Sequence, residues 1–194
     1  MHQLFRYWAL LRKQKPPPFK DGQGKNYAME QVKYYFNSSR LPMPEVDKID
    51  SYFKTEEEGE CPNHVVVLYK GQFFSFVPFD CNGEALSPNV IQATIDEIVA
   101  LCQNETEYAL GTLTTAHREL WSKHFAKLMA ELPDQMKKIS SAICFIILSD
   151  LEPQNESEQL KFTMFNDYQD LWADKSLSFV AFKNGAISSQ SEVS

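Results

Sequence analysis

The chain has 194 residues, 43% of them apolar, which is enough for one domain with a buried core. Its 19 basic and 26 acidic residues give a net charge of −7, so no basic surface is offered to nucleic acid or to an anionic membrane. The longest apolar run, Ala142 to Leu148, is far shorter than the roughly 18 residues that a membrane-spanning helix needs. We therefore expect neither a nucleic-acid partner nor a membrane span.

The first third of the chain is predicted to hold two short helices joined by irregular segments. Residues 3–13 form an amphipathic pattern that Pro16-Pro17-Pro18 ends, because consecutive prolines remove donors and impose extended backbone. The composition of residues 21–24 indicates a turn, without the residue order of a phosphate-binding loop. A second helix is expected over residues 27–37, and an irregular acidic stretch from there to Pro62.

The middle of the chain is predicted to form a hairpin and two helices. Residues 64–69 and 72–79 are rich in β-branched and aromatic side chains and are separated by Lys70-Gly71, a hairpin signal. Ser87 followed by Pro88 has the order of an N-cap and a first helical position, which starts a helix over 88–101. A second helix is expected from Thr114 or Thr115 up to Pro133, with an apolar stripe made of Leu120, Trp121, Phe125, Leu128 and Leu132.

The last third contains the strongest strand signal. Residues 143–148 are apolar without alternation, which is typical of a central strand covered on both faces. Asn155 with Glu158 resembles a capping box for a helix that reaches about Ala173. Residues 177–182 then form a strand.

A hairpin turn is expected at Asn184-Gly185, with a second strand that has scarcely begun at Ser194. No repeat is present, and the order of elements predicts an α/β or α+β fold, a mixed sheet with flanking helices.

Chemistry-bearing residues do not gather into a recognisable site. His117 and His124 lie seven positions apart on one predicted helix, but zinc needs a third ligand, so we expect structural histidines there. The same holds for the isolated His2 and His64, while Glu56 to Glu58 with Glu60 are expected to be solvated. We therefore assign no catalytic, cofactor-binding or metal-binding residue from pattern alone.

Cysteine usage indicates a reducing compartment. The four cysteines are widely spaced and contain no C-x-x-C pair; they are Cys61, Cys81, Cys102 and Cys144. We expect four free thiols.

Three segments together resemble the choline/carnitine acyltransferase family. They are residues 36–42 (FNSSRLP), 113–121 (LTTAHRELW) and 172–179 (WADKSLSF), and their order and spacing agree with the family. Residues 52–68 and 182–185 are more similar to the medium-chain, octanoyl-transferring peroxisomal branch than to the acetyl or mitochondrial palmitoyl branches. The resemblance to this branch implies peroxisomal localisation. It is the only ground for that expectation, because Glu192-Val193-Ser194 is not an S-K-L address; without the resemblance we would expect the cytoplasm.

The family fold consists of two similar lobes, like chloramphenicol acetyltransferase, with acyl-CoA and carnitine entering a tunnel between them. The resemblance implies that residues 1–194 are a partial domain, an amino-terminal-lobe fragment, without the later segments that contact these substrates. Members move an acyl group between coenzyme A and the carnitine hydroxyl. They use a histidine in a [DE]-H-A-P motif on the strand after the Asn-Gly turn.

That histidine is missing when the chain is aligned from Asn184-Gly185. Glu192 falls on the acidic position, Val193 on the histidine and Ser194 on the alanine, and Ser188 replaces a glycine. A general base contributes about 10²–10⁴ in rate, and valine cannot take a proton. We therefore expect a fragment that is inactive alone.

Two other hypotheses remain open. One is a non-catalytic binding or regulatory isoform that associates with a full-length relative. The other is a free-standing fold with an unrelated function, disfavoured because an unpaired sheet edge at Phe179 would promote aggregation.

Overall fold

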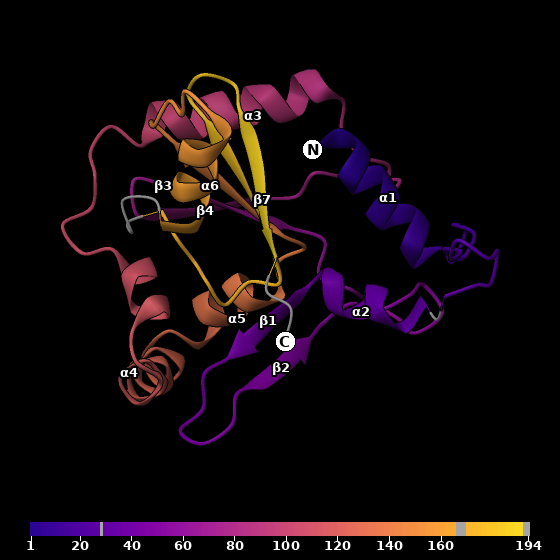
Figure 1. Cartoon of the computed structure of the whole chain (residues 1–194), viewed down its shortest axis with the longest axis horizontal. Coiled ribbons are helices and arrows are strands. Elements are labelled where there is room, and N and C mark those ends of the chain that lie inside the picture. The colour runs from indigo at the N-terminus through magenta and orange to yellow at the C-terminus, as the bar shows by residue number, and fades with distance from the viewer. Residues whose placement is uncertain (28, 166–169, 192–194) are drawn as a thin grey trace.

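The computed structural model describes residues 1–27, 29–165 and 170–191. A five-stranded mixed sheet lies at its centre, in the order β4-β3-β5-β6-β7, and a separate two-stranded sheet pairs β1 with β2 (Figure 1). The strands are β1 Ser38–Leu41, β2 Lys48–Ser51, β3 Val65–Tyr69, β4 Gln72–Phe76, β5 Phe145–Ser149, β6 Leu177–Phe182 and β7 Ile187–Ser191. The predicted mixed sheet with flanking helices is confirmed.

The apolar run of residues 143–148 supplies the central strand, as predicted. β5 pairs in parallel with β3 on one side and with β6 on the other, while β4 and β7 add antiparallel strands at the two edges. Alternate residues of β5 enter different cores, with Ile146 on one face of the sheet and Phe145 and Ile147 on the other. A strand covered on both faces has no polar side to alternate with, which explains its unbroken apolar sequence.

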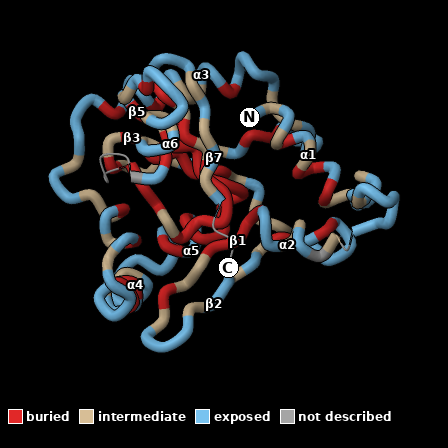
Figure 2. The backbone as a smooth tube through the Cα atoms, in the orientation of Figure 1, coloured by how far each residue is buried: buried red, intermediate tan, exposed pale blue. Residues whose placement is uncertain are grey.

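Helices cover both faces of the sheet. On one face, α1 (His2–Arg12) and α3 (Pro88–Leu101) contribute apolar side chains that pack against Val65 and Val67. On the other, α4 (Arg118–Glu131) and α5 (Pro133–Ser141) do the same against Val66 and Leu68. Figure 1 shows α4 and α5 in the lower part of the view, and the buried strands form the core in Figure 2.

Local signals placed several elements correctly. Lys70 and Gly71 both have left-handed backbone, with φ of 50° and 71°, as a two-residue hairpin between β3 and β4 requires. Ser87 is the N-cap residue of α3 and Pro88 its first residue. Asn155 Oδ1 accepts from the Glu158 N–H over 2.9 Å at the start of α6 (Glu156–Phe165).

The helix predicted over residues 27–37 is confirmed only in part, because the helical residues span 29–35. The described part holds only a 3₁₀ turn, η1 (Met29–Gln31), and one helical turn, α2 (Val32–Tyr35); Ala28 lies outside the described residues. Phe36 is extended, with φ −108° and ψ 153°, and ends the helix.

The stretch expected to be irregular as far as Pro62 contains the β1–β2 hairpin, whose strands pair from Ser38↔Ser51 to Leu41↔Lys48. Neither strand shows a run of β-branched or aromatic residues, so local pattern missed both.

The helix expected from Thr114 or Thr115 begins later. Residues 110–115 form a 3₁₀ helix, η2 (Leu110–Thr115), Ala116 is extended, and α4 starts at Arg118. The proposed stripe is also wrong in part, because Leu120 and Leu132 remain 49% and 41% exposed. The short α5 that starts at Pro133 was not predicted.

The end of the chain also differs from expectation. The helix expected to reach Ala173 ends at Phe165, residues 166–169 lie outside the described residues, and residues 171–173 are not helical. The second strand of the last hairpin is formed, because β7 pairs with β6 from Ala181↔Ile187 to Leu177↔Ser191. Phe179 lies between two partner strands, so the predicted open edge at this residue is wrong. Residues 192–194, which carry the missing-histidine prediction, lie outside the described residues.

Candidate functional site

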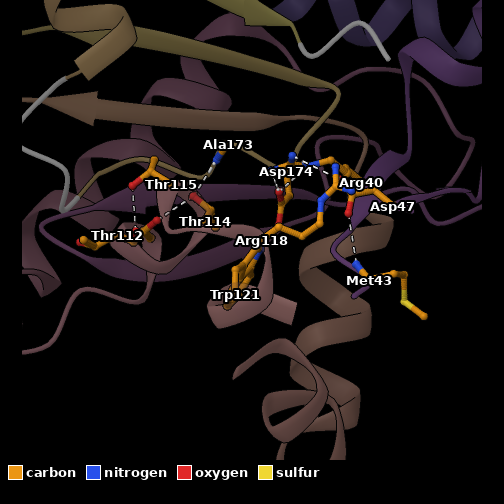
Figure 3. Close-up of polar contacts among 11 residues, drawn as sticks. Arg40, Met43, Asp47, Thr112, Thr114, Thr115, Arg118, Trp121, Ala173 and Asp174 are labelled. Atoms are coloured by element: carbon orange, nitrogen blue, oxygen red, sulfur yellow. Dashed lines mark hydrogen bonds and ion pairs between the residues drawn. The ribbon is translucent and has the colours of Figure 1, made fainter. Parts of the chain in front are cut away.

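Side chains from three distant segments converge on one buried carboxylate, Asp174 (Figure 3). Arg40 on β1 donates from Nε and Nη2 to Asp174 Oδ1 over 2.9 and 2.6 Å. Trp121 on α4 donates from its indole Nε1 to Asp174 Oδ2 over 2.6 Å. The side chain of Asp174 is only 2% exposed. These contacts join the three segments that resemble an acyltransferase, one residue from each.

A second carboxylate extends this cluster toward the surface. Asp47 Oδ2 lies 3.5 Å from Arg40 Nη1 and 3.4 Å from Arg118 Nη2. Asp47 Oδ1 accepts from the Met43 N–H over 3.2 Å, which closes the β1–β2 loop. We name Arg40, Asp47, Arg118, Trp121 and Asp174 the polar junction, in which two cations alternate with two anions.

The electrostatics of the polar junction favour a structural role for Asp174. Burial raises the pKa of Asp174, and the hydrogen bonds from Trp121 and Arg40 and the charge of Arg40 only partly oppose this. Both carboxylate oxygens already accept charge-assisted or indole hydrogen bonds. To act as a general acid or base, Asp174 would have to break these contacts before it exchanged a proton with a substrate. The geometry therefore fits a structural role for Asp174, holding the three segments together, rather than proton transfer.

Backbone hydrogen bonds reinforce the same contact. The Arg40 N–H donates to Asp174 O over 2.8 Å, Ser39 and Lys175 form an antiparallel bridge, and the Ser176 N–H donates to Ser38 O over 3.2 Å. Residues 174–176 therefore lie beside β1 like a short additional strand. They lead directly into β6, so the polar junction fixes the point at which β6 enters the sheet.

The segment of residues 113–121 contacts the chain that leads into β6 at a second point, through Thr114. Thr114 Oγ1 donates to Gly111 O over 2.7 Å and accepts from the Ala173 N–H over 3.0 Å (Figure 3). A hydroxyl that bonds in both directions leaves neither of these backbone groups unpaired.

Asn37, in the first of the three segments, links three other parts of the fold through its side chain. Its Oδ1 accepts from Trp8 Nε1 over 2.8 Å, and its Nδ2 donates to the carbonyl oxygens of Pro62 and Ser141, each over 2.8 Å. Its backbone has φ of +53°, a conformation that asparagine tolerates better than most residues. The residue is fully buried, so this arrangement depends on complete hydrogen bonding.

The four histidines lie at separate places. His2 Nδ1 lies 2.8 Å from Leu86 O, and His64 Nε2 lies 2.8 Å from Lys138 O. His117 is the N-cap residue of α4 and His124 lies within that helix. Within the described ranges, no three His, Cys, Asp or Glu side chains gather as a metal ion would require.

The predicted acidic cluster is also placed by the structure. Glu58 of this loop pairs with Lys33, with 3.0 Å between Oε1 and Nζ.

A groove of about 540 Å³ lies beside the polar junction. Pro42, Met43 and Pro44 form one wall, and α4 forms the other with residues that include Phe125 and Met129. This lining is suited to apolar contact, and no hydrogen-bonded pair of acid and base lines it.

Sequence reasoning missed the polar junction as a site, because the partners are far apart in the chain and each is an ordinary charged residue. The only signal was that each lies in, or close to, a segment that resembles one family. No helix in the described parts of the chain is long and apolar enough to cross a membrane.

The whole chain, including the three segments, is similar to known proteins. The family model for choline/carnitine O-acyltransferases matches residues 1–194. Peroxisomal carnitine O-octanoyltransferase of Rattus norvegicus is 31% identical over 192 residues, which cover 95% of this chain and 31% of the rat protein. The human protein of the same name is also 31% identical over 192 residues.

A more distant relative matches a shorter stretch. Human mitochondrial carnitine O-palmitoyltransferase 2 is 30% identical over 164 residues, which cover 82% of this chain and 24% of that protein. The chain thus spans about a third of the length of the octanoyltransferases it matches. Because the family model covers every residue, this chain belongs to the choline/carnitine acyltransferase family.

Proposed function

We propose that this chain is a framework part of a carnitine O-acyltransferase lobe with the chloramphenicol-acetyltransferase-like arrangement of the family. The observation that carries this is the convergence of three family-like segments on Asp174, at the entry to β6. In the proposed arrangement the polar junction holds the β6–β7 hairpin, beyond which the family places its catalytic histidine. The octanoyltransferase relatives support the medium-chain branch.

The reaction we assign to the complete protein is acyl transfer between a medium-chain acyl-CoA and carnitine. The carnitine hydroxyl is a poor nucleophile at neutral pH, so a base must remove its proton as it attacks the thioester carbonyl. In the ungapped alignment from Asn184-Gly185, Val193 stands where the family has this base, and valine cannot take a proton. We assign no catalytic or cofactor-binding residue to this chain, and the 194-residue polypeptide is proposed to be inactive alone.

A thiol-release assay tests this proposal. Purified 194-residue protein is mixed with octanoyl-CoA and carnitine, and coenzyme A is quantified by chromatography, which avoids interference from protein cysteines. We expect no release above the uncatalysed rate, whereas the rat octanoyltransferase serves as the positive control. Circular dichroism with a cooperative denaturant transition must first establish that the chain is folded. Turnover near that of the rat enzyme would overturn the proposal.

The substitution Val193→His separates two causes of inactivity. If only the base were missing, this variant would gain measurable turnover. We expect it to remain inactive, because the proposed tunnel also needs a facing lobe.

We propose peroxisomal localisation on the basis of the octanoyltransferase relatives, which fluorescence microscopy of the tagged complete protein would test.

A second candidate function is a non-catalytic partner of a full-length relative. It is favoured by β7, whose outer edge has no strand partner within the described residues and carries the exposed Ile187. Coexpression with the rat octanoyltransferase followed by affinity capture tests it. Recovery of the chain alone would end this hypothesis.

A further inference from the structure

Lys175 places an amine in the interior of the protein. The residue is only 2% exposed, and its Nζ donates to Ser140 O over 2.8 Å and to Ser39 Oγ over 3.4 Å. Both acceptors are uncharged. Lysine is almost never fully buried without an anionic partner, and Lys175 forms no ion pair within the described residues, which makes this position unusual.

The number of acceptors matches an uncharged amine. An ammonium group has three N–H donors, whereas a neutral amine has two, and the described surroundings offer two acceptors to Lys175. Ser39 Oγ also donates to Ser140 O over 2.9 Å, so this carbonyl is already shared. Protonation would therefore add both a buried charge and a donor without a partner.

The charged and titratable groups around Lys175 do not offset such a charge. Asp174 is adjacent in sequence but is bound to Arg40 and Trp121. Cys144, at the start of β5, is a fully buried thiol whose pKa burial raises to about 12. His64, before β3, has a pKa lowered by burial and by the positive charges of Lys138 and Lys175.

A catalytic role for the pair of Ser39 and Lys175 is excluded by access. A serine hydroxyl beside an uncharged lysine is the arrangement of Ser–Lys nucleophiles. Here both residues are only 2% exposed, and neither lines the grooves described for residues 1–27, 29–165 and 170–191. In the folded chain this burial shields the hydroxyl from solvent, so a conformational role fits better than a chemical one.

We propose that Lys175 is a pH-sensitive fastener: as an uncharged amine it holds residues 174–176 against β1 and the end of α5, and its protonation loosens this contact. The fastener acts on the same entry to β6 as the polar junction. It does not depend on the proposed function, because it concerns the folded chain itself.

The direction of the pH effect follows from burial. Desolvation lowers the pKa of Lys175 from 10.5 to about 7. Below pH 7 both the folded and the unfolded states carry the charge, and the folded state bears the full penalty. Between pH 7 and 10.5 the unfolded state binds more protons, so stability rises with pH and then levels off.

The unfolding equilibria of the wild-type chain and of Lys175→Met, measured in denaturant at several pH values, test this. The methionine removes the titrating group at similar volume, and the ionisable groups whose pKa does not depend on Lys175 cancel in the ratio of the two equilibrium constants. We expect the wild type to gain at least about tenfold in stability relative to the variant between pH 7 and pH 9. Lys137→Met, which removes an exposed lysine of α5, is the matched control and should change the corresponding ratio less than twofold.

Two measurements on the wild type keep the proposal testable if Lys175→Met does not fold. One lysine ¹³Cε resonance should titrate near pH 7, far below the others. The amide protection factors of Arg40 and Ser176, corrected for intrinsic exchange, should fall between pH 8.5 and pH 6. A stability ratio that does not vary with pH, or lysine resonances that all titrate above pH 9, would overturn the proposal.

Discussion

The indole of Trp121 donates to Asp174 Oδ2 over 2.6 Å, although 53 positions separate the two residues in the sequence. Arg40, which bonds the other oxygen of the same carboxylate, lies 134 positions away. These contacts form only when β1, α4 and the entry to β6 are all in place. The polar junction therefore depends on the complete arrangement of helices and sheet.

Replacing Asp174 by Asn tests the strength of the polar junction. The amide can still accept from Trp121, but Arg40 loses its buried counter-charge, and the carboxylate of Asp47 lies farther away, at 3.5 Å. We expect a loss of about 3 kcal/mol in unfolding free energy, the low end for a broken buried ion pair, because Arg40 retains some solvent contact. Urea denaturation followed by tryptophan fluorescence measures it.

Glu131→Gln is the matched control for Asp174→Asn. It removes the same charge from the pair Lys127–Glu131, whose atoms are 3.8 Å apart and whose side chains are 69% and 61% exposed. Exposed pairs contribute little, so a change below about 0.5 kcal/mol is expected. Equal losses for the two variants would show that Asp174 contributes no more than a surface residue.

Replacing Asn37 tests the second polar centre of the fold. Asn37→Ala leaves Trp8 Nε1 without this acceptor and two carbonyl oxygens without these donors, and it places alanine in left-handed backbone. Each unpaired buried group costs about 1–3 kcal/mol, so we expect a total loss of at least about 3 kcal/mol. The same urea experiment measures it.

Asn37→Gly separates the backbone from the side-chain contribution. It loses the same hydrogen bonds but accepts a φ of +53° without strain, and it should be about 1 kcal/mol more stable than the alanine variant. A glycine variant that is less stable than Asn37→Ala would contradict the assignment of strain to this backbone position.

Thiol reactivity should follow burial. All four cysteines are free; Cys81 is exposed, Cys61 is partly buried, and Cys102 and Cys144 are buried. Burial raises the pKa of Cys61, Cys102 and Cys144, which lowers the thiolate fraction in addition to blocking access.

A short pulse of iodoacetamide at pH 8, followed by peptide mass spectrometry, should modify Cys81 first and Cys61 more slowly. Cys102 and Cys144 should react only after unfolding, and a denatured sample provides the reference rate for all four. Modification of Cys144 as fast as Cys81 in the native chain would contradict the placement of β5 at the centre of the sheet.

Local sequence signals were sufficient where neighbouring residues decide the structure. Lys70-Gly71 between two runs of β-branched and aromatic residues predicted the β3–β4 hairpin, because glycine in a two-residue connection favours a tight turn. Ser87-Pro88 predicted the start of α3, and the apolar run of residues 143–148 predicted the buried β5. The resemblance of three short segments also predicted the family.

Other features were decided only by the tertiary structure, because their energies come from distant partners. Asn37 was predicted to lie in a helix but has left-handed backbone, and Trp8, Pro62 and Ser141 supply hydrogen bonds that the local sequence does not reveal. Likewise, Asp174 and Lys175 are adjacent residues with ordinary side chains. Folding buries both, binds one to Arg40 and Trp121, and surrounds the other with uncharged acceptors. The sequence by itself thus determined the family and the elements that local signals define, while long-range burial decided which charges form the polar junction and which side chain becomes a buried, titrating amine.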